Sequence, residues 1–596
     1  MAPSALATPI AVLRGGEWLL TATEPDAVLT PEGLTEEQQL IARTTVDFVN
    51  AEVLPQLGRL EEQDWPLARA LLVRCGELGL LSVDVSDAYG GLQLDKVTSM
   101  LVSEHMSRSA SFSSTFGAQA NLTILPISLF GTDAQKRKYL PRLMAGETVG
   151  AYCLSETGSG SDALGAKTVA ARQADGSFIL NGEKMWITNG GIADVFIVFA
   201  KVDGELFSAF IVERAFGGLA SGKEEDKMGL HGCSTTPIVL QDVKVPAENL
   251  LGDVGKGHKV AFNVLNFGRF KLGAMCAGAA RDAVGDAARY AAERKQFGQP
   301  IASFGAIKHK LGEMIVRTYA VESLSYRTAG MIDARIARAT EHPADTTAAL
   351  ATLEEYAIEA SIAKVAGSEV LDFVLDENIQ IHGGNGYVRD YPAERMYRDA
   401  RVNRIFEGTN EINRLLISGI LARRAAKGDV PIIAAAKALQ DELLAPSAPQ
   451  GDDDSALAEE RRVVAALKKT TVLVLGLAMQ TYTQKLADEQ EVLMWLADML
   501  IDVYSADSAV IRAAAAARAT SPRAGLHADA ARVFVSDAAM RVDTCARQAL
   551  AAMAEGDTLR TWLAGLRRLM KVMPAGTVAP RRRLADAAVA RRGYPL

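Results

Sequence analysis

The chain has 596 residues, of which 49% are hydrophobic and 23% charged, a composition typical of globular proteins and a length sufficient for several domains. The net charge of −8 gives no general attraction to nucleic acid, and we expect no nucleic-acid partner. Five widely spaced cysteines and seven histidines without metal-ligand spacing indicate neither a disulfide framework nor a metal site.

The first segment, residues 1–34, matches neither a secretory signal nor a transit peptide, and we treat it as an N-terminal extension. Residues 35–146 carry apolar residues at helical spacing, and Thr35 with Gln38 matches a capping box at the first helix. We therefore predict a helical domain over 35–146. The best apolar run, at 470–484, is short and contains Thr and Gln, which argues against a membrane span.

Residues 147–258 consist of short β-rich runs separated by Asp-Gly, Asn-Gly and Gly-Gly, which predicts a separate β domain. Helical spacing returns over 259–425. A Pro-, Ser- and acid-rich linker lies within 430–460, and the segment 426–596 is otherwise Ala-, Leu- and Arg-rich helix. The predicted fold class is therefore multi-domain α+β, in the order helical, β, helical, with an extra helical segment.

The stretch "YCLSETGSGSDA" contains Gly158-x-Gly160-x-x-Ala163, which matches a dinucleotide-binding fingerprint. That fingerprint requires a helix to follow, whereas a strand, an Asp-Gly turn and a strand follow here, so we reject a Rossmann fold. A loop of small and hydroxyl residues remains, which lets backbone N–H groups approach a phosphate or a flat polar ring, with a merely flexible loop as the alternative. Trp186, near Thr188 in a predicted strand, would offer its ring to a flavin edge, with a core tryptophan as the alternative.

One acid stands out in the basic stretch "RDARVNRIFEGTNEINRLL", where Glu407 lies between Phe406 and Gly408. It is either a solvated loop acid or a general base. A carboxylate base needs a dry site that tunes its pKa towards the working pH. Phe406 would supply an apolar wall, Gly408 permits a sharp turn, and Thr409 can cap the next helix.

Five stretches in chain order resemble motifs of the acyl-CoA dehydrogenase family. They are "YCLSETGSGSDA", "NGEKMWITNGGIAD", "DKMGLHGCSTTPIVLQDVKVPAENLLG", "AAERKQFGQPIASF" and "QIHGGNGYVRDYPAERMYRDARVNRIFEGTNEI". The resemblance covers roughly residues 35–425, and the helical tail with "LNFGRF" at 265–270 is most like the very-long-chain branch. It implies an N-terminal helical domain, a middle β-barrel-like domain and a C-terminal four-helix bundle, here followed by an extra α-helical domain.

The resemblance also implies an FAD-dependent reaction on an acyl-CoA substrate. A base removes the α-proton, a hydride leaves Cβ for flavin N5, and a trans-2-enoyl-CoA forms in fatty-acid β-oxidation. Electrons would pass to an electron-transfer flavoprotein. We expect a homo-oligomer, with a dimer favoured, in the cytoplasm of a bacterium, or in the mitochondrial matrix if the source is eukaryotic.

The resemblance makes Glu407 the base, because the position that carries it in other members is Gly268 here. Substrate would contact Ser161, Asn266, Arg269 and Gly408, with a buried ion pair as the alternative for Arg269. The residues expected to hold FAD are Tyr152, Leu154, Ser155, Gly160, Ser161, Trp186, Ile187, Thr188, Arg294, Gln296, Phe304, Gln380, Gly383, Gly384, Thr409 and Glu411. Arg294, Gln296 and Phe304 would reach the FAD of a neighbouring subunit, and a first-turn helix acid is the alternative for Glu411.

Some residues depart from the family pattern. Thr157 replaces a usual proline, and Phe406 replaces a frequent tyrosine. Thr123 and Pro126 stand where very-long-chain members place glycines, which predicts a shorter or differently shaped acyl pocket. In the tail, "VVAALKKTTVLVLGLAM" either packs on the same chain or makes weak peripheral membrane contact.

Two other functions remain open at this stage. A flavin oxidase or monooxygenase on the same fold would consume oxygen. A catalytically silent assembly protein would use the fold for binding only, an alternative that Glu407 and the flavin motifs argue against.

Overall fold

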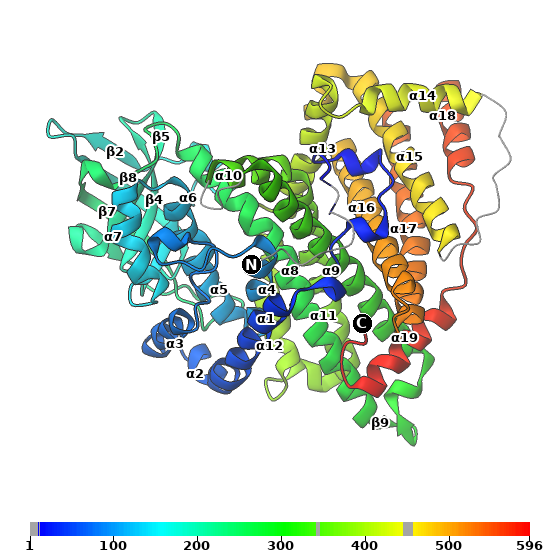
Figure 1. The fold of residues 1–596 in the computed structure, drawn as a ribbon, viewed down its shortest axis with the longest axis horizontal. Coiled ribbons are helices and arrows are strands. Elements are labelled where there is room, and N and C mark those ends of the chain that lie inside the picture. Colours follow the sequence, from blue (N-terminus) through cyan, green and yellow to red (C-terminus); the bar gives the residue numbers. More distant parts are fainter. Residues whose placement is uncertain (1–9, 11, 341–345, 445–456) are drawn as a thin grey trace.

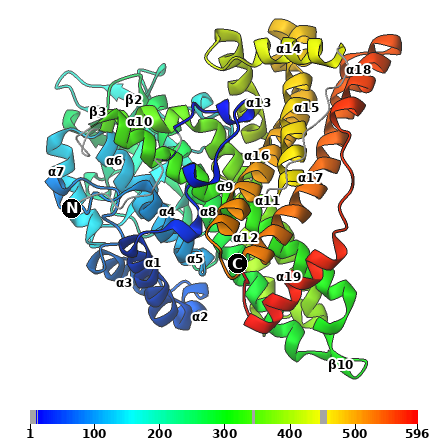
Figure 2. The same ribbon diagram turned by 45° about the vertical axis from the view of Figure 1, so that its right-hand side comes forward.

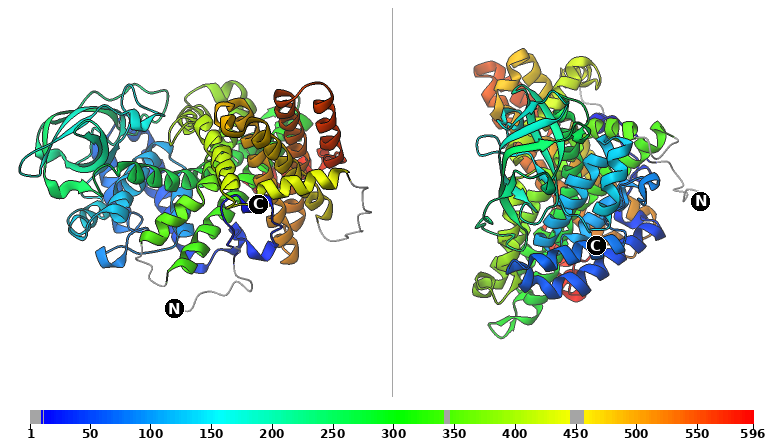
Figure 3. Two further views of the ribbon diagram at one scale, coloured as in Figure 1. Left: turned by 90° about the horizontal axis from the view of Figure 1, so that it is seen from above. Right: turned by 90° about the vertical axis from the view of Figure 1, so that its left-hand side faces the viewer.

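The computed structural model describes residues 10, 12–340, 346–444 and 457–596. Figure 1 shows a β-sheet at one end, long helices in the middle and a further group of helices at the other end. The view from above in Figure 3 places the sheet and the C-terminal helices at opposite ends as well. The predicted order of helical, β and helical segments, with extra C-terminal helices, is confirmed.

The N-terminal helices precede the sheet in the chain. They are α1 (Glu36–Phe48), α2 (Leu57–Glu61), α3 (Trp65–Glu77), α4 (Lys96–Met106), α5 (Ala110–Gln119), α6 (Leu125–Phe130) and α7 (Asp133–Met144). The predicted capping box is confirmed: Thr35 Oγ1 accepts from the Gln38 N–H at 3.2 Å, and the Gln38 side chain accepts from the Thr35 N–H at 3.0 Å. Local sequence alone therefore fixes the start of α1.

One sheet of eight strands forms the middle part of the chain. The strands are β1 (Gly150–Cys153), β2 (Val169–Arg172), β3 (Phe178–Thr188), β4 (Val195–Val202), β5 (Leu206–Glu213), β6 (Leu219–Ser221), β7 (Thr235–Val245) and β8 (Leu250–Leu251). Their order is β6-β7-β3-β2-β4-β5-β8, with β1 added parallel to β4. β4 is buried along nearly its whole length, as expected for a central strand.

Four long helices form the bundle beside the sheet: α8 (Gly257–Glu293), α9 (Gly305–Ala339), α11 (Ala357–His382) and α13 (Asn410–Lys427). Shorter elements connect them, namely β9 (Lys295–Gln296), β10 (Gln299–Pro300), α10 (Thr346–Glu355) and α12 (Pro392–Ala400). α8 and α11 run parallel, because Gly273 meets Ala363 near one end and the Tyr290 ring stacks on His382 at 4.0 Å near the other. A Cβ on Gly273 would lie 2.8 Å from the Ala363 Cβ, so glycine permits this close approach.

Six helices make up the C-terminal part: α14 (Ile432–Leu444), α15 (Ala458–Tyr482), α16 (Gln490–Arg518), α17 (Ala524–Met553), α18 (Gly556–Leu569) and α19 (Val578–Arg591). Figure 2 shows α15, α16 and α17 standing beside the bundle, while α19 crosses back to pack on α9 and α8. The segment Ala458–Asp488 is long and apolar enough to cross a membrane by length and composition, but 67% of its apolar window is buried within the protein. This burial favours packing on the same chain over membrane contact.

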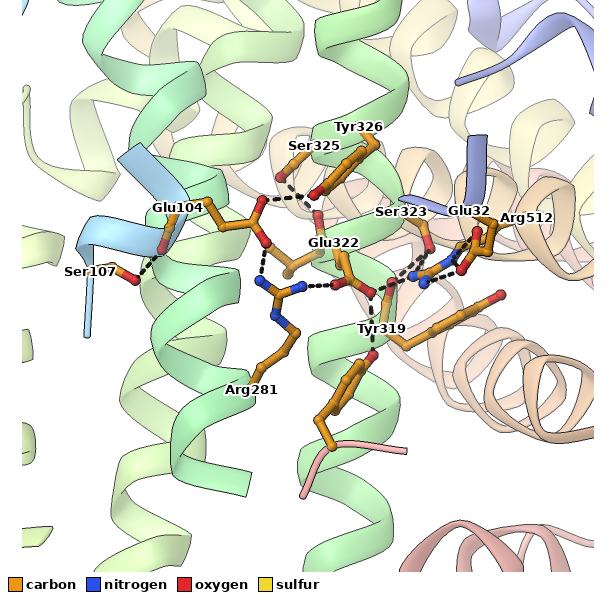
Figure 4. Close-up of polar contacts among 12 residues, drawn as sticks. Glu32, Glu104, Ser107, Arg281, Tyr319, Glu322, Ser323, Ser325, Tyr326 and Arg512 are labelled. Carbon is orange, nitrogen blue, oxygen red and sulfur yellow. Dashed lines mark hydrogen bonds and ion pairs between the residues drawn. The ribbon is translucent and has the colours of Figure 1, made fainter. Parts of the chain in front are cut away.

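A chain of buried charges joins the C-terminal helices to the bundle (Figure 4). Arg281 on α8 bonds Glu104 on α4 and, at 2.7 Å, Glu322 on α9. Glu322 also accepts from Arg512 of α16 at 2.5 Å, and Arg512 holds Glu32 of the N-terminal extension at 2.6 Å. Removing one partner of such a buried network typically costs ~3–5 kcal/mol. The C-terminal helices are thus tied to the bundle by specific contacts as well as by apolar packing.

Candidate active site

Glu407 lies in a tight turn just before α13. Its φ is 58°, and that of Gly408 is 78°, so two consecutive residues adopt the left-handed conformation. Glycine tolerates this conformation, whereas a non-glycine residue such as Glu407 pays on the order of 1–3 kcal/mol for it. Thr409 Oγ1 accepts from the Ile412 N–H at 3.3 Å, so the predicted helix cap is confirmed.

Buried side chains hold the carbonyl groups of this turn. Arg269 Nε donates to the Glu407 carbonyl at 3.0 Å, and its Nη1 donates to Asn266 Oδ1 at 3.0 Å. Lys364 Nζ donates to the Gly408 carbonyl at 2.8 Å, and Asn413 Nδ2 donates to the same carbonyl at 2.8 Å. Arg269 therefore positions the turn through a carbonyl and an amide, which differs from the buried ion pair considered as its alternative.

Oε2 of the Glu407 carboxylate is buried and has no hydrogen-bond partner among the residues that the structure describes. Burial raises the pKa of Glu407 to about 7, while the positive charges of Arg269 and Lys364 act in the opposite direction. A Cβ built on Gly268 would lie 3.0 Å from Glu407 Oε2, so α8 approaches the carboxylate here without any side chain of its own. A carboxylate with these properties can exchange a proton near neutral pH.

The edge of the β domain meets this site through Tyr152 on β1. Its hydroxyl is buried and has no partner, and burial together with the charge of Glu407 raises the pKa of Tyr152 well above its usual range. Leu154, just after β1, and Ile187, near the end of β3, are buried, whereas Ser155 and Thr188 are half-buried. The Met185 N–H donates to the Ser155 carbonyl at 3.0 Å, which ties the loop after β1 to strand β3.

Trp186 is turned outward by an irregularity in β3. The register with β7 shifts between Lys184 and Ile187, Trp186 has a φ of 55°, and its side chain is 58% exposed. Bulges of this kind re-aim side chains beside functional sites. Trp186 therefore does not belong to the core, which was the alternative to its predicted role as a ring platform.

The glycine-rich loop is anchored at one side and open at the other. Glu156 pairs with buried Lys184 at 2.7 Å and accepts from the Lys167 N–H at 2.6 Å. By contrast, a Cβ on Gly158 or Gly160 would meet no atom within 4 Å. Ser161, Gly160 and Thr157 are exposed. This arrangement differs from a merely flexible loop, because its base is fixed by buried hydrogen bonds.

The remaining cofactor candidates fall into two places. Thr409 and Glu411 lie beside Glu407 at the start of α13. Arg294, Gln296, Phe304, Gln380, Gly383 and Gly384 lie at or just beyond the far ends of α8 and α11. Arg294 follows Gly268 by 26 residues of helix, which at 1.5 Å per residue is about 39 Å. Within one chain, the residues at the far ends of α8 and α11 therefore lie far from Glu407.

The sequence did not predict three residues that pack around the Glu407 turn: Lys364 on α11, and Asn410 and Asn413 on α13. Lys364 Nζ also donates to Asn410 Oδ1 at 2.6 Å. The available signal was Lys364 between the apolar residues of "IAKVAG", since a buried lysine needs polar partners. Thr123 packs against β1, where a Cβ on Gly150 would lie 2.3 Å from it. Its effect on the acyl pocket stays a prediction. Pro126 is buried in α6.

These features fit a flavin. The exposed Trp186 ring offers a flat surface, the loop at Gly158 and Gly160 leaves space for a ligand beside its backbone, and the Tyr152 hydroxyl lacks a partner. The fit rests on residues of β1, of β3 and of the loop that follows β1.

Comparison with known proteins supports the same conclusion. Models described as acyl-CoA dehydrogenase N-terminal, middle and C-terminal domains match residues 35–147, 151–243 and 255–422. A further model, also described as an acyl-CoA dehydrogenase C-terminal domain, matches residues 466–568.

Among solved structures, an acyl-CoA dehydrogenase complexed with FAD from Bacillus anthracis is 46% identical, with a TM-score of 0.96, covering 98% of this chain and 100% of that one. A probable acyl-CoA dehydrogenase of Bacillus subtilis is 44% identical over 96% of this chain and 97% of its own length. The human very long-chain specific acyl-CoA dehydrogenase is 41% identical over 57% of this chain and 51% of its own length. The chain therefore belongs to the acyl-CoA dehydrogenase family of FAD-dependent oxidoreductases.

Proposed function

We propose that this protein dehydrogenates an acyl-CoA thioester between Cα and Cβ, with Glu407 as the base. The observation that carries the proposal is the buried, unpartnered Glu407 Oε2, whose carboxyl has a pKa of about 7. In the family, some members carry the base at the position of Gly268, and the absence of a side chain there leaves Glu407 without a rival.

The turn around Glu407 would perform two tasks. Arg269, Lys364 and Asn413 fix its carbonyl groups, so the carboxylate can take the α-proton without reorganisation of the backbone. In the part of the chain that the structure describes, the Glu407 N–H donates no hydrogen bond. We assign it to the thioester carbonyl oxygen, where negative charge develops as the proton leaves.

Burial assists the proton transfer directly. The protonated carboxyl is the neutral form, and the apolar surroundings that raise the pKa of Glu407 favour it. The protonated Glu407 carboxyl, which α-proton abstraction produces, is therefore stabilised by its surroundings. FAD, when bound, supplies the acceptor for the hydride that leaves Cβ and gives a trans-2-enoyl-CoA.

On the sheet side, the residues proposed to hold FAD are Tyr152, Leu154, Ser155, Gly160, Ser161, Trp186, Ile187 and Thr188. Thr409 and Glu411 would hold it on the bundle side. The separation of about 39 Å along α8 between Gly268 and Arg294 suggests that Arg294, Gln296, Phe304, Gln380, Gly383 and Gly384 serve the FAD of a partner subunit. This supports a homodimer as the working form.

The wider role proposed is fatty-acid β-oxidation with an electron-transfer flavoprotein as acceptor. Relatives named as very long-chain specific acyl-CoA dehydrogenases support the substrate class. A structure titled as an electron transferring flavoprotein of Acidaminococcus fermentans contains a chain 36% identical to this one, with a TM-score of 0.59. The location proposed is the cytoplasm of a bacterium, in line with the bacterial relative that matches over 97% of its own length.

Anaerobic mixing with acyl-CoA tests the proposed reaction. The purified flavoprotein should lose its flavin absorbance on adding a suitable acyl-CoA, and the enoyl-CoA should be detected by mass. No bleaching with any member of a panel from butyryl- to hexadecanoyl-CoA would contradict the proposal. Fast oxygen consumption would instead indicate an oxidase, as in a relative 28% identical whose title names a prolyl acyl carrier protein oxidase.

A further inference from the structure

A cavity lies beside the Glu407 turn, where Phe406, next in the chain to the base, lines it together with residues of α8 and α11. Its α8 wall is formed by Leu272, Met275, Cys276 and Ala279. These positions follow Gly268 by 4, 7, 8 and 11 residues, so they share the helix face that Gly268 turns towards Glu407. The distance from Gly268 to Ala279 is about 16 Å at 1.5 Å per residue.

Two other walls follow the same direction. Leu371 and Leu375 line the cavity from α11, on the face where Lys364 meets the Glu407 turn. Phe406 lines it next to the base. The near part of the cavity is thus apolar and lies next to the proposed base, which is the environment that an acyl chain requires.

The far part of the cavity is polar. Arg108 donates to Asp282 at 3.2 Å there, and both residues line the cavity. Ser109, next in sequence to Arg108, is 3% exposed, and its hydroxyl has no hydrogen-bond partner. Ser113 lines the same wall one helical turn later. An unpaired hydroxyl buried in this way is costly unless a ligand or water completes its hydrogen bonds.

Asp399 contributes an acceptor from the α12 side. It is 5% exposed, and its Oδ1 accepts from the Leu230 N–H at 2.6 Å. Burial and the negative charge of Glu61 raise the pKa of Asp399, so the carboxyl groups of Asp399 and Glu61 lie near each other. Because Glu61 Oε1 accepts from Ser111 Oγ at 2.9 Å, Asp399 also lies near the start of α5. The far wall therefore offers a hydroxyl donor on α5 and a carboxylate acceptor on α12.

We propose that this cavity selects acyl chains that bear a hydroxyl group at the end remote from the thioester, through Ser109 and Asp399. The inference rests on the proposed dehydrogenase function and adds the substrate class to it. A hydroxyl can accept from Ser109 Oγ and donate to the Asp399 carboxylate. A methyl end would leave the Ser109 hydroxyl without a partner, so a plain chain should bind less well than a hydroxy chain of the same length.

Length-matched substrates test this preference. The wild-type holoenzyme is reduced anaerobically with plain and ω-hydroxy acyl-CoAs of equal chain length, from butyryl to hexadecanoyl. At the lengths that reach the far wall, kcat/KM should be highest for the hydroxy form, by about 10-fold over the plain form. Short chains should show no such order.

Two serine variants locate the effect. Ser109→Ala should remove the hydroxy-over-plain ratio, whereas Ser114→Ala should keep it. Ser114 lines the same cavity, but its hydroxyl already donates to the Ala110 carbonyl at 2.9 Å within its own helix. Flavin content and thermal unfolding show whether each variant is folded. The hydroxy-over-plain ratio of kcat/KM in the wild-type enzyme tests the preference without any variant.

The outcomes separate the inference from the function on which it rests. If every substrate bleaches the flavin but plain chains match or exceed hydroxy chains at all lengths, the far wall is filled by water and the inference is wrong, while the dehydrogenase assignment stands. If no acyl-CoA bleaches the flavin, both are wrong. If Ser109→Ala keeps the wild-type ratio, the assigned recognition by Ser109 is wrong.

Discussion

Gly268 and Glu407 face each other across the candidate site, so that a Cβ on Gly268 would lie 3.0 Å from Glu407 Oε2. Residues 139 positions apart in the chain thus share one position in space. The carboxylate comes from the turn before α13, and α8 leaves room for it by having no side chain there.

This relationship predicts that the base can be moved. Glu407→Gly alone should lower kcat/KM by the 10²–10⁴-fold typical of losing a general base. Adding Gly268→Glu to that variant should restore part of the lost activity, because the new carboxylate occupies the same space. Anaerobic flavin reduction measures both variants, and equal inactivity of the two would show that the α8 position cannot deliver a base.

The turn itself is predicted to require glycine after Glu407. Gly408 has a φ of 78°, and an added Cβ would lie 3.2 Å from Asn413 Nδ2 and 3.3 Å from Arg269 Nη2. Gly408→Ala should therefore destabilise the fold by about 1–2 kcal/mol and reduce turnover. Gly419→Ala on α13 is the matched control, since its Cβ meets no atom within 4 Å and its φ is helical. Thermal unfolding and kcat separate the two, and equal behaviour would refute the role of the turn.

The pKa of Glu407 predicts how activity depends on pH. The base must be deprotonated, so kcat/KM should rise with pH and reach half its plateau near pH 7. The charge of Lys364 lowers the pKa of Glu407, so Lys364→Met should move the half-point to higher pH. Lys427→Met, an exposed change at the end of α13, should not move it. A half-point that stays fixed in Lys364→Met would contradict the electrostatic account.

A shared FAD site predicts complementation between two inactive variants. Arg294→Gln should lose FAD, although Arg294 lies about 39 Å along α8 from Gly268. When it is co-expressed with Glu407→Gln, mixed dimers contain one site with both native residues. Random pairing should then restore about a quarter of wild-type activity. Activity no higher than that of the separate variants would place Arg294 outside the partner's site.

Local sequence predicted the features that depend on neighbours in the chain. The cap at Thr35 and the cap at Thr409 follow from side chains three residues from their partners. The change from helical spacing to short β-rich runs predicted the order of the segments. In these cases the physical cause lies within one turn of a helix or one strand.

Features that depend on distant residues were not predictable in this way. Lys364 bonds a carbonyl 44 positions away, and Arg512 bonds Glu32 across 480 positions. The outward turn of Trp186 depends on pairing with β7 and on a φ of 55°, neither of which its neighbours in sequence specify. The contact of Thr123 with β1 likewise depends on a residue distant in the chain, Gly150.

The most direct test of Glu407 as the base is anaerobic flavin reduction by the Glu407→Gln variant. The amide keeps the shape of the side chain but cannot accept the α-proton, so FAD should remain bound with its yellow spectrum while the rate of bleaching falls by at least 10²–10⁴-fold. Glu37→Gln, an exposed change on α1, should bleach at the wild-type rate. Bleaching of Glu407→Gln at a near-normal rate would contradict the assignment of the base.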